Sequence, residues 1–382
     1  MERITNINSQ RVVWCCADLG LTPEQVVAEL GWSPERLNAV IDGNGGLTFT
    51  QLRAMAEFFG RSVLFFLESE EVDAERVHSP QFRTLAGQKP DLSRRVRLLV
   101  QRAEYQRKIY LDLTEDVEGA ERSRFLPPEL PSDPVEAARV AREWLSLGEN
   151  NDFEKFRSAV EQRGILVFRT NGYAGKWQIA KESSILGFAL YDPSTPVIVV
   201  RKQKAESMQS FTLMHELGHI LLHRTSSVDD DADLRATRGM EREANRFAAH
   251  LLVPDSYLAK LLATDRPDDN AELDEWLKPF RSAWGVSADV ILLRLVDERR
   301  MQKSAYESYC GWRDGQYEAE EEQGGSRAYR YREPRHVFGD RYVRAVLNAL
   351  DAQQITLNKA SDYLDGLKVR DLHKLEQFYA GV

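Results

Sequence analysis

The sequence predicts an α+β fold that is mainly helical and contains one small sheet. Helix-start signals dominate the first third of the chain, runs rich in β-branched and aromatic residues cluster in the middle, and helical spacing returns afterwards. This helix–sheet–helix order is typical of α+β domains. The length of 382 residues predicts more than one domain, because single hydrophobic cores seldom grow beyond about 250–300 residues.

Short helices are predicted at the amino terminus. Thr22 and Ser33 each stand before a helix-start proline followed by glutamate, which is a capping arrangement. The second of these helices ends after Ile41 at a glycine-rich turn, and a further helix opens at Thr50. Helix, tight turn and helix together make residues 1–75 a helix-turn-helix candidate.

The rest of the chain divides by composition into four segments. Residues 76–130 are more basic and predict a helical connector that ends at a cluster of prolines. Residues 131–300 predict one α+β domain. Within it, β-branched and aromatic residues predict three strands, Ile165–Phe168, Ile185–Tyr191 and Pro196–Val200. Residues 301–326 end in an acidic, glycine-rich run and predict a linker, and residues 327–382 predict a small helical C-terminal module.

Composition excludes several classes of protein. The chain has 51 Lys plus Arg against 60 Asp plus Glu, a formal net charge of −9, and 42% hydrophobic residues, which is typical of a globular protein. No apolar run approaches the ~18 residues of a membrane helix, so we expect no membrane partner. The three cysteines make neither a disulfide framework nor a Cys-x-x-Cys pair. With no secretory signal visible at the start, a cytoplasmic location is expected.

The most informative motif is His215-Glu216-Leu217-Gly218-His219. Histidines four residues apart on a helix lie on one face, about 5–6 Å apart at Cβ, so both imidazoles can bind one cation. Glu216 lies one step round the helix, where it can accept a proton from a water whose pKa the metal lowers to about 7. We therefore predict His215 and His219 as metal ligands and Glu216 as the catalytic base. The alternative is an ordinary amphipathic helix that happens to hold these residues.

A catalytic zinc ion usually has a third protein ligand and an open position. The elongated motif that supplies a further histidine is excluded, because Leu222 and Thr225 stand where its glycine and histidine would fall. A carboxylate from a following helix is the other common source. Glu243 adjoins the apolar face of the predicted helix over residues 240–252, where an unpaired carboxylate is costly to bury. We predict Glu243 as the third ligand, with Glu241 as the alternative.

The chain resembles a known family in this region, the ImmA/IrrE family of metallopeptidases. The resemblance covers about residues 164–295 and rests on four segments: Pro196–Val200, Phe211–His223, Glu241–Pro254 and Trp284–Ser287. It implies a zincin-like fold and cleavage of a partner transcriptional repressor in response to stress.

Carried over residue by residue, the resemblance assigns the metal ligands to His215, His219 and Glu243 and the general base to Glu216. His250 departs from the family pattern, which more often has an acidic or small residue there. Zinc is the expected metal, although imidazole and carboxylate groups also accept Mn²⁺ or Fe²⁺.

The amino-terminal helices resemble an XRE-type helix-turn-helix, which is often fused upstream of this peptidase. The resemblance makes Trp32–Ile41 the recognition helix, with Arg36 and Asn38 able to meet base edges. Residues 1–75, however, hold five Arg, no Lys and twelve acidic residues, a net charge of −7 that opposes binding to phosphates. Protein contact or dimerisation is therefore as strong an expectation here as DNA binding.

A basic, aromatic segment at Arg327–His336 offers a second surface for nucleic acid, but the acidic chain favours a loop that docks elsewhere on the protein. His223 is expected to be a structural histidine at a helix end.

Two functions from different classes follow from these patterns. The first is a zinc-dependent endopeptidase that cleaves a partner protein, a repressor or a cognate toxin, in a stress or toxin–antitoxin circuit. The second is a helix-turn-helix transcriptional regulator or antitoxin that binds DNA or a toxin and whose metal site is structural or vestigial. A homodimer is compatible with either function.

Overall fold

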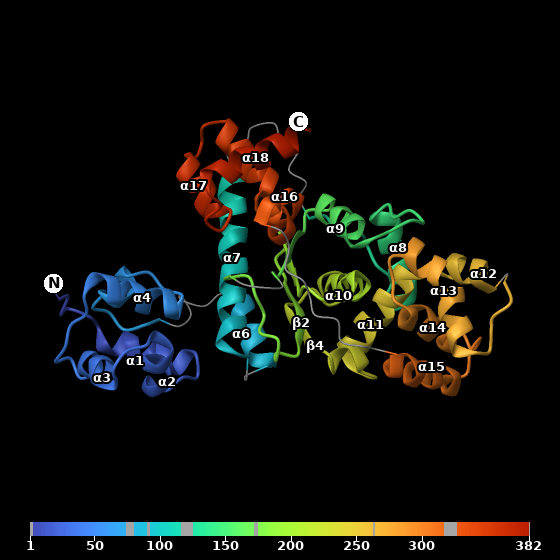
Figure 1. Ribbon diagram of the computed structural model, residues 1–382, viewed down its shortest axis with the longest axis horizontal. Helices are drawn as coiled ribbons and strands as arrows, with labels where there is room; N and C mark the ends of the chain where they lie inside the picture. The colour runs from blue at the N-terminus through green and yellow to red at the C-terminus, as the bar shows by residue number, and fades with distance from the viewer. Residues whose placement is uncertain are drawn as a thin grey trace. The chain divides into compact units, whose positions relative to one another are not determined.

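The computed structural model describes residues 3–73, 80–89, 92–115, 125–171, 175–262, 264–316 and 327–381. Contacts divide the chain into two compact units, Met1–Arg102 and Ala103–Val382. Helices predominate, and one four-stranded sheet lies in the second unit, which confirms the predicted α+β class (Figure 1). The finer division into five segments stays a prediction. Among the described helices, none combines the length and the apolar character that crossing a membrane requires.

The first unit is a cluster of short helices. Its described elements are α1 (Ser9–Asp18), α2 (Pro23–Leu30), α3 (Pro34–Ile41), α4 (Phe49–Phe59), the 3-10 turn η1 (Leu64–Phe66) and α6 (Pro80–Gln88). Thr22 and Thr48 each accept a hydrogen bond from a backbone N–H in a reciprocal capping box, which fixes where α2 and α4 begin. The predicted helix starts at Thr22 and Ser33 are found, whereas the start predicted at Thr50 lies at Phe49.

Helix α7 (Arg94–Glu115) crosses the division between the units. The connector therefore holds two helices, α6 and α7, in its described part rather than one continuous helix.

The second unit holds most of the helices. They are α8 (Pro134–Trp144), α9 (Phe153–Gln162), α10 (Glu206–Gly218), η2 (His219–His223), η3 (Asp233–Arg235), α11 (Gly239–Leu252), α12 (Asp255–Leu262), α13 (Asn270–Trp284), α14 (Ala288–Asp297), α15 (Lys303–Gln316), η4 (Arg327–Arg332), α16 (Glu333–Asp351), α17 (Leu357–Tyr363) and α18 (Val369–Ala380). Helix α15 lies where the sequence predicts a linker, because Tyr309 is buried in the main core and Trp312 packs against it.

The sheet has four strands, β1 (Leu166–Arg169), β2 (Ile185–Leu190), β3 (Val197–Val200) and β4 (Ser227–Asp230), in the order β1-β3-β2-β4. Strands β1 and β3 are parallel, and β2 runs antiparallel to both β3 and β4. The first three strands match the predicted ones. Strand β4 was not predicted, because its Ser-Val-Asp-Asp sequence has little β-branched or aromatic content.

Both faces of the sheet are covered. Val167 and Ile198 belong to the main core with residues of α10 and α11, such as Leu217 and Phe247. The opposite face carries Phe168, whose ring lies 5.8 Å from that of Phe338 and 5.9 Å from that of Tyr342 on α16. The segment that begins at residue 327 thus packs on the sheet through α16.

Two buried charged side chains of α9, Arg157 and Glu161, hold α16 against the rest of the unit through hydrogen bonds to its backbone. Arg157 of α9 donates to the backbone oxygens of Val167 and of three residues of α16, Arg335, His336 and Val337. Glu161, one turn further along α9, accepts from the backbone N–H groups of Asp340 and Arg341. Those two amides open the second half of α16, after a break at Gly339, and the Glu161 side chain supplies the acceptor that both need.

Candidate metal centre

Helix α10 carries the His-Glu-x-x-His motif into the core. His215 and Glu216 have no exposed surface, and His219 is 1% exposed at the first position of the π-helical segment η2. Leu213 and Leu217 alternate with these polar residues and pack into the main core. The helix therefore packs apolar side chains into the core and buries the polar side chains of the motif as well.

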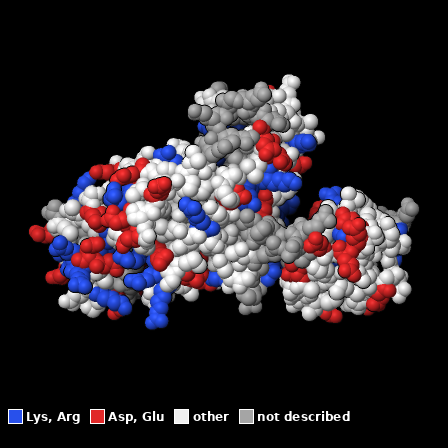
Figure 2. Space-filling view, turned by 180° about the vertical axis from the view of Figure 1, so that it is seen from behind, with Lys and Arg blue, Asp and Glu red and all other residues white. Residues whose placement is uncertain are grey.

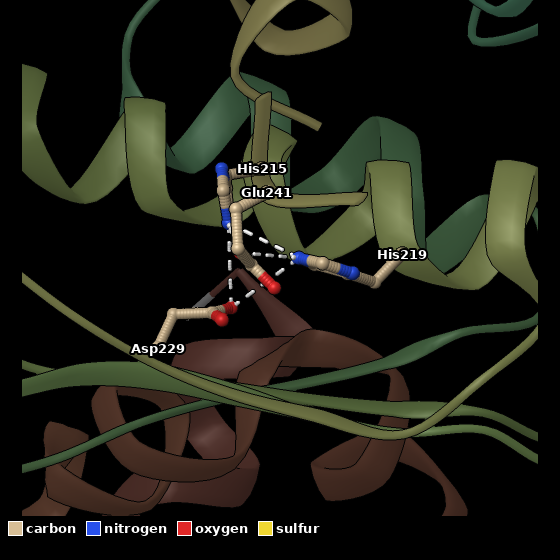
Figure 3. Close-up of side chains that lie close together, drawn as sticks. All are labelled: His215, His219, Asp229 and Glu241. Carbon is tan, nitrogen blue, oxygen red and sulfur yellow. Dashed lines mark hydrogen bonds and ion pairs between the residues drawn. The ribbon is translucent and has the colours of Figure 1, made fainter. Parts of the chain in front are cut away.

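Four side chains converge next to this helix: His215, His219, Asp229 and Glu241 (Figure 3). The two Nε2 atoms lie 3.2 Å apart. The Glu241 Oε2 atom is 3.3 Å from Nε2 of His215 and 3.2 Å from Nε2 of His219. The Asp229 Oδ2 atom is 3.4 Å and 3.7 Å from the same two nitrogens.

These separations fit a metal ion. With metal–ligand distances of 2.0–2.1 Å, the ligand atoms of a tetrahedral zinc site lie about 3.3–3.4 Å from one another. Five of the six separations within this group fall between 3.2 and 3.7 Å. Two imidazoles and two carboxylates are also donor types that zinc accepts. The group therefore suits a divalent cation by both geometry and chemistry.

Close helix packing brings Glu241 to the histidines. A Cβ added at Gly218 would lie 3.3 Å from the Ala244 Cα atom and 3.2 Å from the Phe247 ring, so the glycine lets α10 and α11 approach closely. Glu241, in the first turn of α11, then reaches both imidazoles. Burial raises the pKa of Glu241, but its hydrogen bonds to the two histidines outweigh burial and hold the pKa well below its usual range.

Burial opposes the charged form of His215. The adjoining carboxylates of Asp229 and Glu241 outweigh this effect and raise its pKa to about 9. Without a metal, a proton on His215 offsets part of the negative charge of Asp229 and Glu241, and a divalent cation bound to the deprotonated imidazoles can take over that role.

Glu216 lies beside the group and not in it. Its Oε2 atom accepts a 2.9 Å hydrogen bond from the Ser227 hydroxyl, and its Oε1 atom has no hydrogen-bond partner among the described residues. A Cβ added at Gly187 on β2 would lie 2.7 Å from Oε1, so only glycine leaves room for this carboxylate. Burial, and then the negative charge of Asp229, raise the pKa of Glu216 well above its usual value.

The structure does not bring Glu243 into the group. Its carboxylate lies 3.1 Å from Nε2 of His223, and its side chain is 54% exposed. The Nδ1 atom of His223 lies 3.1 Å from Nδ1 of His219. If His219 turns its Nε2 lone pair to a metal, its Nδ1–H donates to His223, which must then donate from Nε2–H to Glu243. Glu243 and His223 therefore hold the ring of His219 in place.

The remaining sequence-predicted residues lie elsewhere. His250 is buried near Arg294, away from the metal group, and burial with the charge of that arginine lowers its pKa to about 4. In the C-terminal segment, Arg335 pairs with Asp340, and the Arg332 guanidinium lies over the Phe378 ring.

Sequence reasoning missed Asp229, Ser227 and Gly187. Asp229 and Ser227 lie on the unpredicted strand β4, and Gly187 lies inside a strand that the sequence predicts by its apolar neighbours. A glycine within an apolar strand run is a known sign of a close approach. The acidic run around Asp229 carries no comparable signal.

Comparison with known proteins agrees with this site. Residues 160–296 match the model of peptidase family M78, described as an IrrE N-terminal-like domain, which is a zincin-like fold. The matched range contains the whole metal group and Glu216. It supports the predicted ImmA/IrrE resemblance and indicates a metallopeptidase; the amino-terminal helices lie outside it, and their XRE resemblance stays a prediction. A search among curated proteins found no match.

Proposed function

We propose that this chain is a zinc-dependent endopeptidase of the ImmA/IrrE type, with its catalytic centre at His215, His219, Glu241 and Glu216. The observation that carries the proposal is the near-tetrahedral spacing of donor atoms beside a buried glutamate with one free oxygen. Glu241, the alternative that the sequence left open, replaces Glu243 as the third ligand in this proposal.

The chemistry divides between the metal and the chain. When bound, the metal acts as a Lewis acid that polarises the carbonyl group of the scissile peptide bond. Glu216 accepts a proton at Oε1 from the attacking water and then donates it to the leaving amine nitrogen. Burial raises the pKa of Glu216, which means that its carboxylate holds an accepted proton more tightly than an exposed glutamate does. In this structure the Ser227 hydroxyl donates to the other carboxylate oxygen, and Oε1 has no hydrogen-bond partner among the described residues.

Zinc is the proposed metal because the donor set is two imidazoles with carboxylates at tetrahedral spacing. Mn²⁺ accepts the same donor types but favours sites with more oxygen ligands. Metal analysis of the protein purified without chelators separates the two, and we expect about one zinc ion per chain.

The proposed substrate is a regulatory protein, a transcriptional repressor or a cognate toxin. Four side chains cannot select one protein sequence, so recognition has to come from the flanking helical segments. Among the charged side chains of the N-terminal unit on the face seen in Figure 2, acidic ones predominate, in agreement with its composition. This suits a protein partner better than a phosphate backbone.

The test uses the full chain loaded with zinc and the repressor encoded beside its gene. We expect cleavage of the repressor into two defined products. Glu216→Gln should abolish cleavage and keep the zinc, since an amide cannot accept the proton but leaves the ligands intact. Equal cleavage by this variant would reject Glu216 as the base. Absence of stoichiometric metal from the native protein would reject the whole proposal.

One observation favours the second candidate, a helix-turn-helix regulator or antitoxin with a structural metal. Asp229 supplies a fourth protein donor, and structural zinc sites are closed by four protein ligands. This candidate predicts a stable complex with a toxin or with promoter DNA and no proteolysis. A gel-shift assay on its own promoter and a pull-down with the neighbouring gene product distinguish it from the peptidase.

A further inference from the structure

Strand β4 places two polar side chains in the metal centre. Ser227 and Asp229 are two residues apart, so their side chains point to the same side of the strand. Ser227 donates to Glu216, and Asp229 approaches the two metal-facing imidazole nitrogens. One short strand therefore touches both the proposed base and the metal group.

Asp229 is a buried carboxylate whose surroundings favour a bound cation. The residue is 2% exposed, and its Oδ2 atom makes no hydrogen bond to any described residue. In the described structure no Lys or Arg forms an ion pair with it, and its charged neighbours include Glu216 and Glu241. Its ion-pair partners are the imidazoles of His215 and His219, and neither ring can keep a proton on Nε2 once that nitrogen binds a metal. A metal held between His215 and His219 supplies the missing positive charge.

A fourth protein donor has a consequence for the proposed peptidase. Catalytic zinc sites have three protein ligands and leave the fourth position to water or substrate, whereas sites with four protein ligands are closed. With Asp229 in place, the position that hydrolysis needs is filled. Ser227 of the same strand meanwhile occupies one oxygen of Glu216.

Strand β4 is a short strand at the edge of the described sheet. It has four residues, and among the described strands it pairs only with β2, across a register shift between Ile185 and Gly187. It follows Arg224, a non-glycine residue with a φ of 51°. The histidines and Glu241, by contrast, lie on α10, η2 and α11, which pack against each other through the main core.

We propose that Asp229 is a fourth metal ligand that keeps this centre closed, and that movement of strand β4 opens it. This inference rests on the proposed peptidase function. In the closed form Asp229 binds the metal and Ser227 holds Glu216. In the open form both contacts are lost together, since both residues leave with one strand. No covalent change is involved.

The test uses the full chain with Co²⁺ in place of zinc, because the visible spectrum of bound Co²⁺ depends on its ligands. Acetohydroxamate, a small chelating ligand, is the probe for an open position. The Co²⁺ spectrum of the wild-type protein should not change when acetohydroxamate is added. The Co²⁺ spectrum of Asp229→Ala should change, because acetohydroxamate can bind at the position that the aspartate leaves open. Asp229→Ala should also lose its metal to a competing chelator at a chelator concentration at least about tenfold lower than the wild type requires.

Two further variants act as controls. Asp231→Asn removes the same charge from an exposed turn residue next to the strand and should behave as wild type. Asp229→Asn removes the charge but keeps the side-chain volume, so it can replace Asp229→Ala in the test if the alanine variant does not fold. The metal-induced rise in Tm should be smaller for either Asp229 variant than for wild type.

The outcomes separate the two proposals. If wild type and both Asp229 variants hold Co²⁺ equally and respond alike to acetohydroxamate, Asp229 is not a ligand and the inference fails, while the proposed peptidase stands. If none of the proteins binds Co²⁺, the inference and the proposed function both fail. If the Asp229 variants open the site and also cleave the repressor faster than wild type, closure by β4 is supported.

Discussion

At the scale of single residues, the metal centre depends on which of two glutamates faces the histidines. Glu241 and Glu243 are two positions apart on α11, so they point to different sides of the helix. Glu241 contacts both metal-facing nitrogens, and Glu243 contacts His223. Periodicity shows that both residues lie near the apolar face, but the rotation of α11 against α10 decides which one reaches the site.

The paired variants Glu241→Gln and Glu243→Gln test this assignment. Loss of a ligand should cost more metal affinity than loss of a residue that orients a ligand, whose removal costs about 10–100-fold. We expect Glu241→Gln to lose most bound zinc and Glu243→Gln to retain it with an affinity about tenfold lower. Competition with a coloured chelator measures both. The reverse order of affinities would identify Glu243 as the ligand.

Gly187 sets the position of the proposed base. An alanine there places a methyl group 2.7 Å from Glu216 Oε1, so the carboxylate has to shift. A misplacement of about 1 Å can cost about 10²-fold in rate. We expect Gly187→Ala to keep its zinc and to lose repressor cleavage by that order. Gly148→Ala, which meets no atom within 4 Å, is the matched control and should keep full activity.

At the scale of elements, α16 is held by a titratable group. Glu161 is buried at the start of the second half of α16, and burial, partly offset by the charge of Arg157, raises its pKa to about 7. A raised pKa in the folded state means that the folded chain binds the proton more tightly than the unfolded chain. This contribution to stability is complete below about pH 4 and is lost as pH rises to about 7.

Glu161→Gln, a neutral mimic of the protonated form, should remove this pH dependence. We expect the free energy of unfolding of wild type to fall relative to that of the variant between about pH 4.5 and 7. The change should be a few kcal/mol at most, at about 1.4 kcal/mol per unit of pKa. Denaturant titrations at several pH values measure it. A constant difference across this range would show that Glu161 is ionised throughout.

At the scale of the whole molecule, the proposed metal would join three elements of the second unit: α10 with η2, α11 and β4. Ligands that bind only the folded state stabilise it, by about 4 kcal/mol when present at 1,000 times their Kd. Removal of the metal by a chelator should therefore lower the Tm of the second unit, by roughly 10 °C. His215→Ala should have the lower Tm already and should not respond to the chelator, which differential scanning calorimetry can measure.

The class of fold, three of the four strands and the His-Glu-x-x-His motif could be predicted from the amino-acid sequence. Each of these depends on local spacing: a helix brings every fourth residue to one face, and β-branched runs favour strands wherever they lie. The resemblance of residues 164–295 to a peptidase family was also visible, and the match over residues 160–296 supports it.

The carboxylates that meet the histidines could not be predicted in this way. Glu241 reaches them because Gly218 lets α10 and α11 approach closely, and Asp229 arrives on a strand too polar for its sequence to predict. These contacts join residues 10 to 26 positions apart through the packing of separate elements. Local periodicity places a residue on a face of its own element, whereas the position and rotation of that element against its neighbours come from the packing of the whole core.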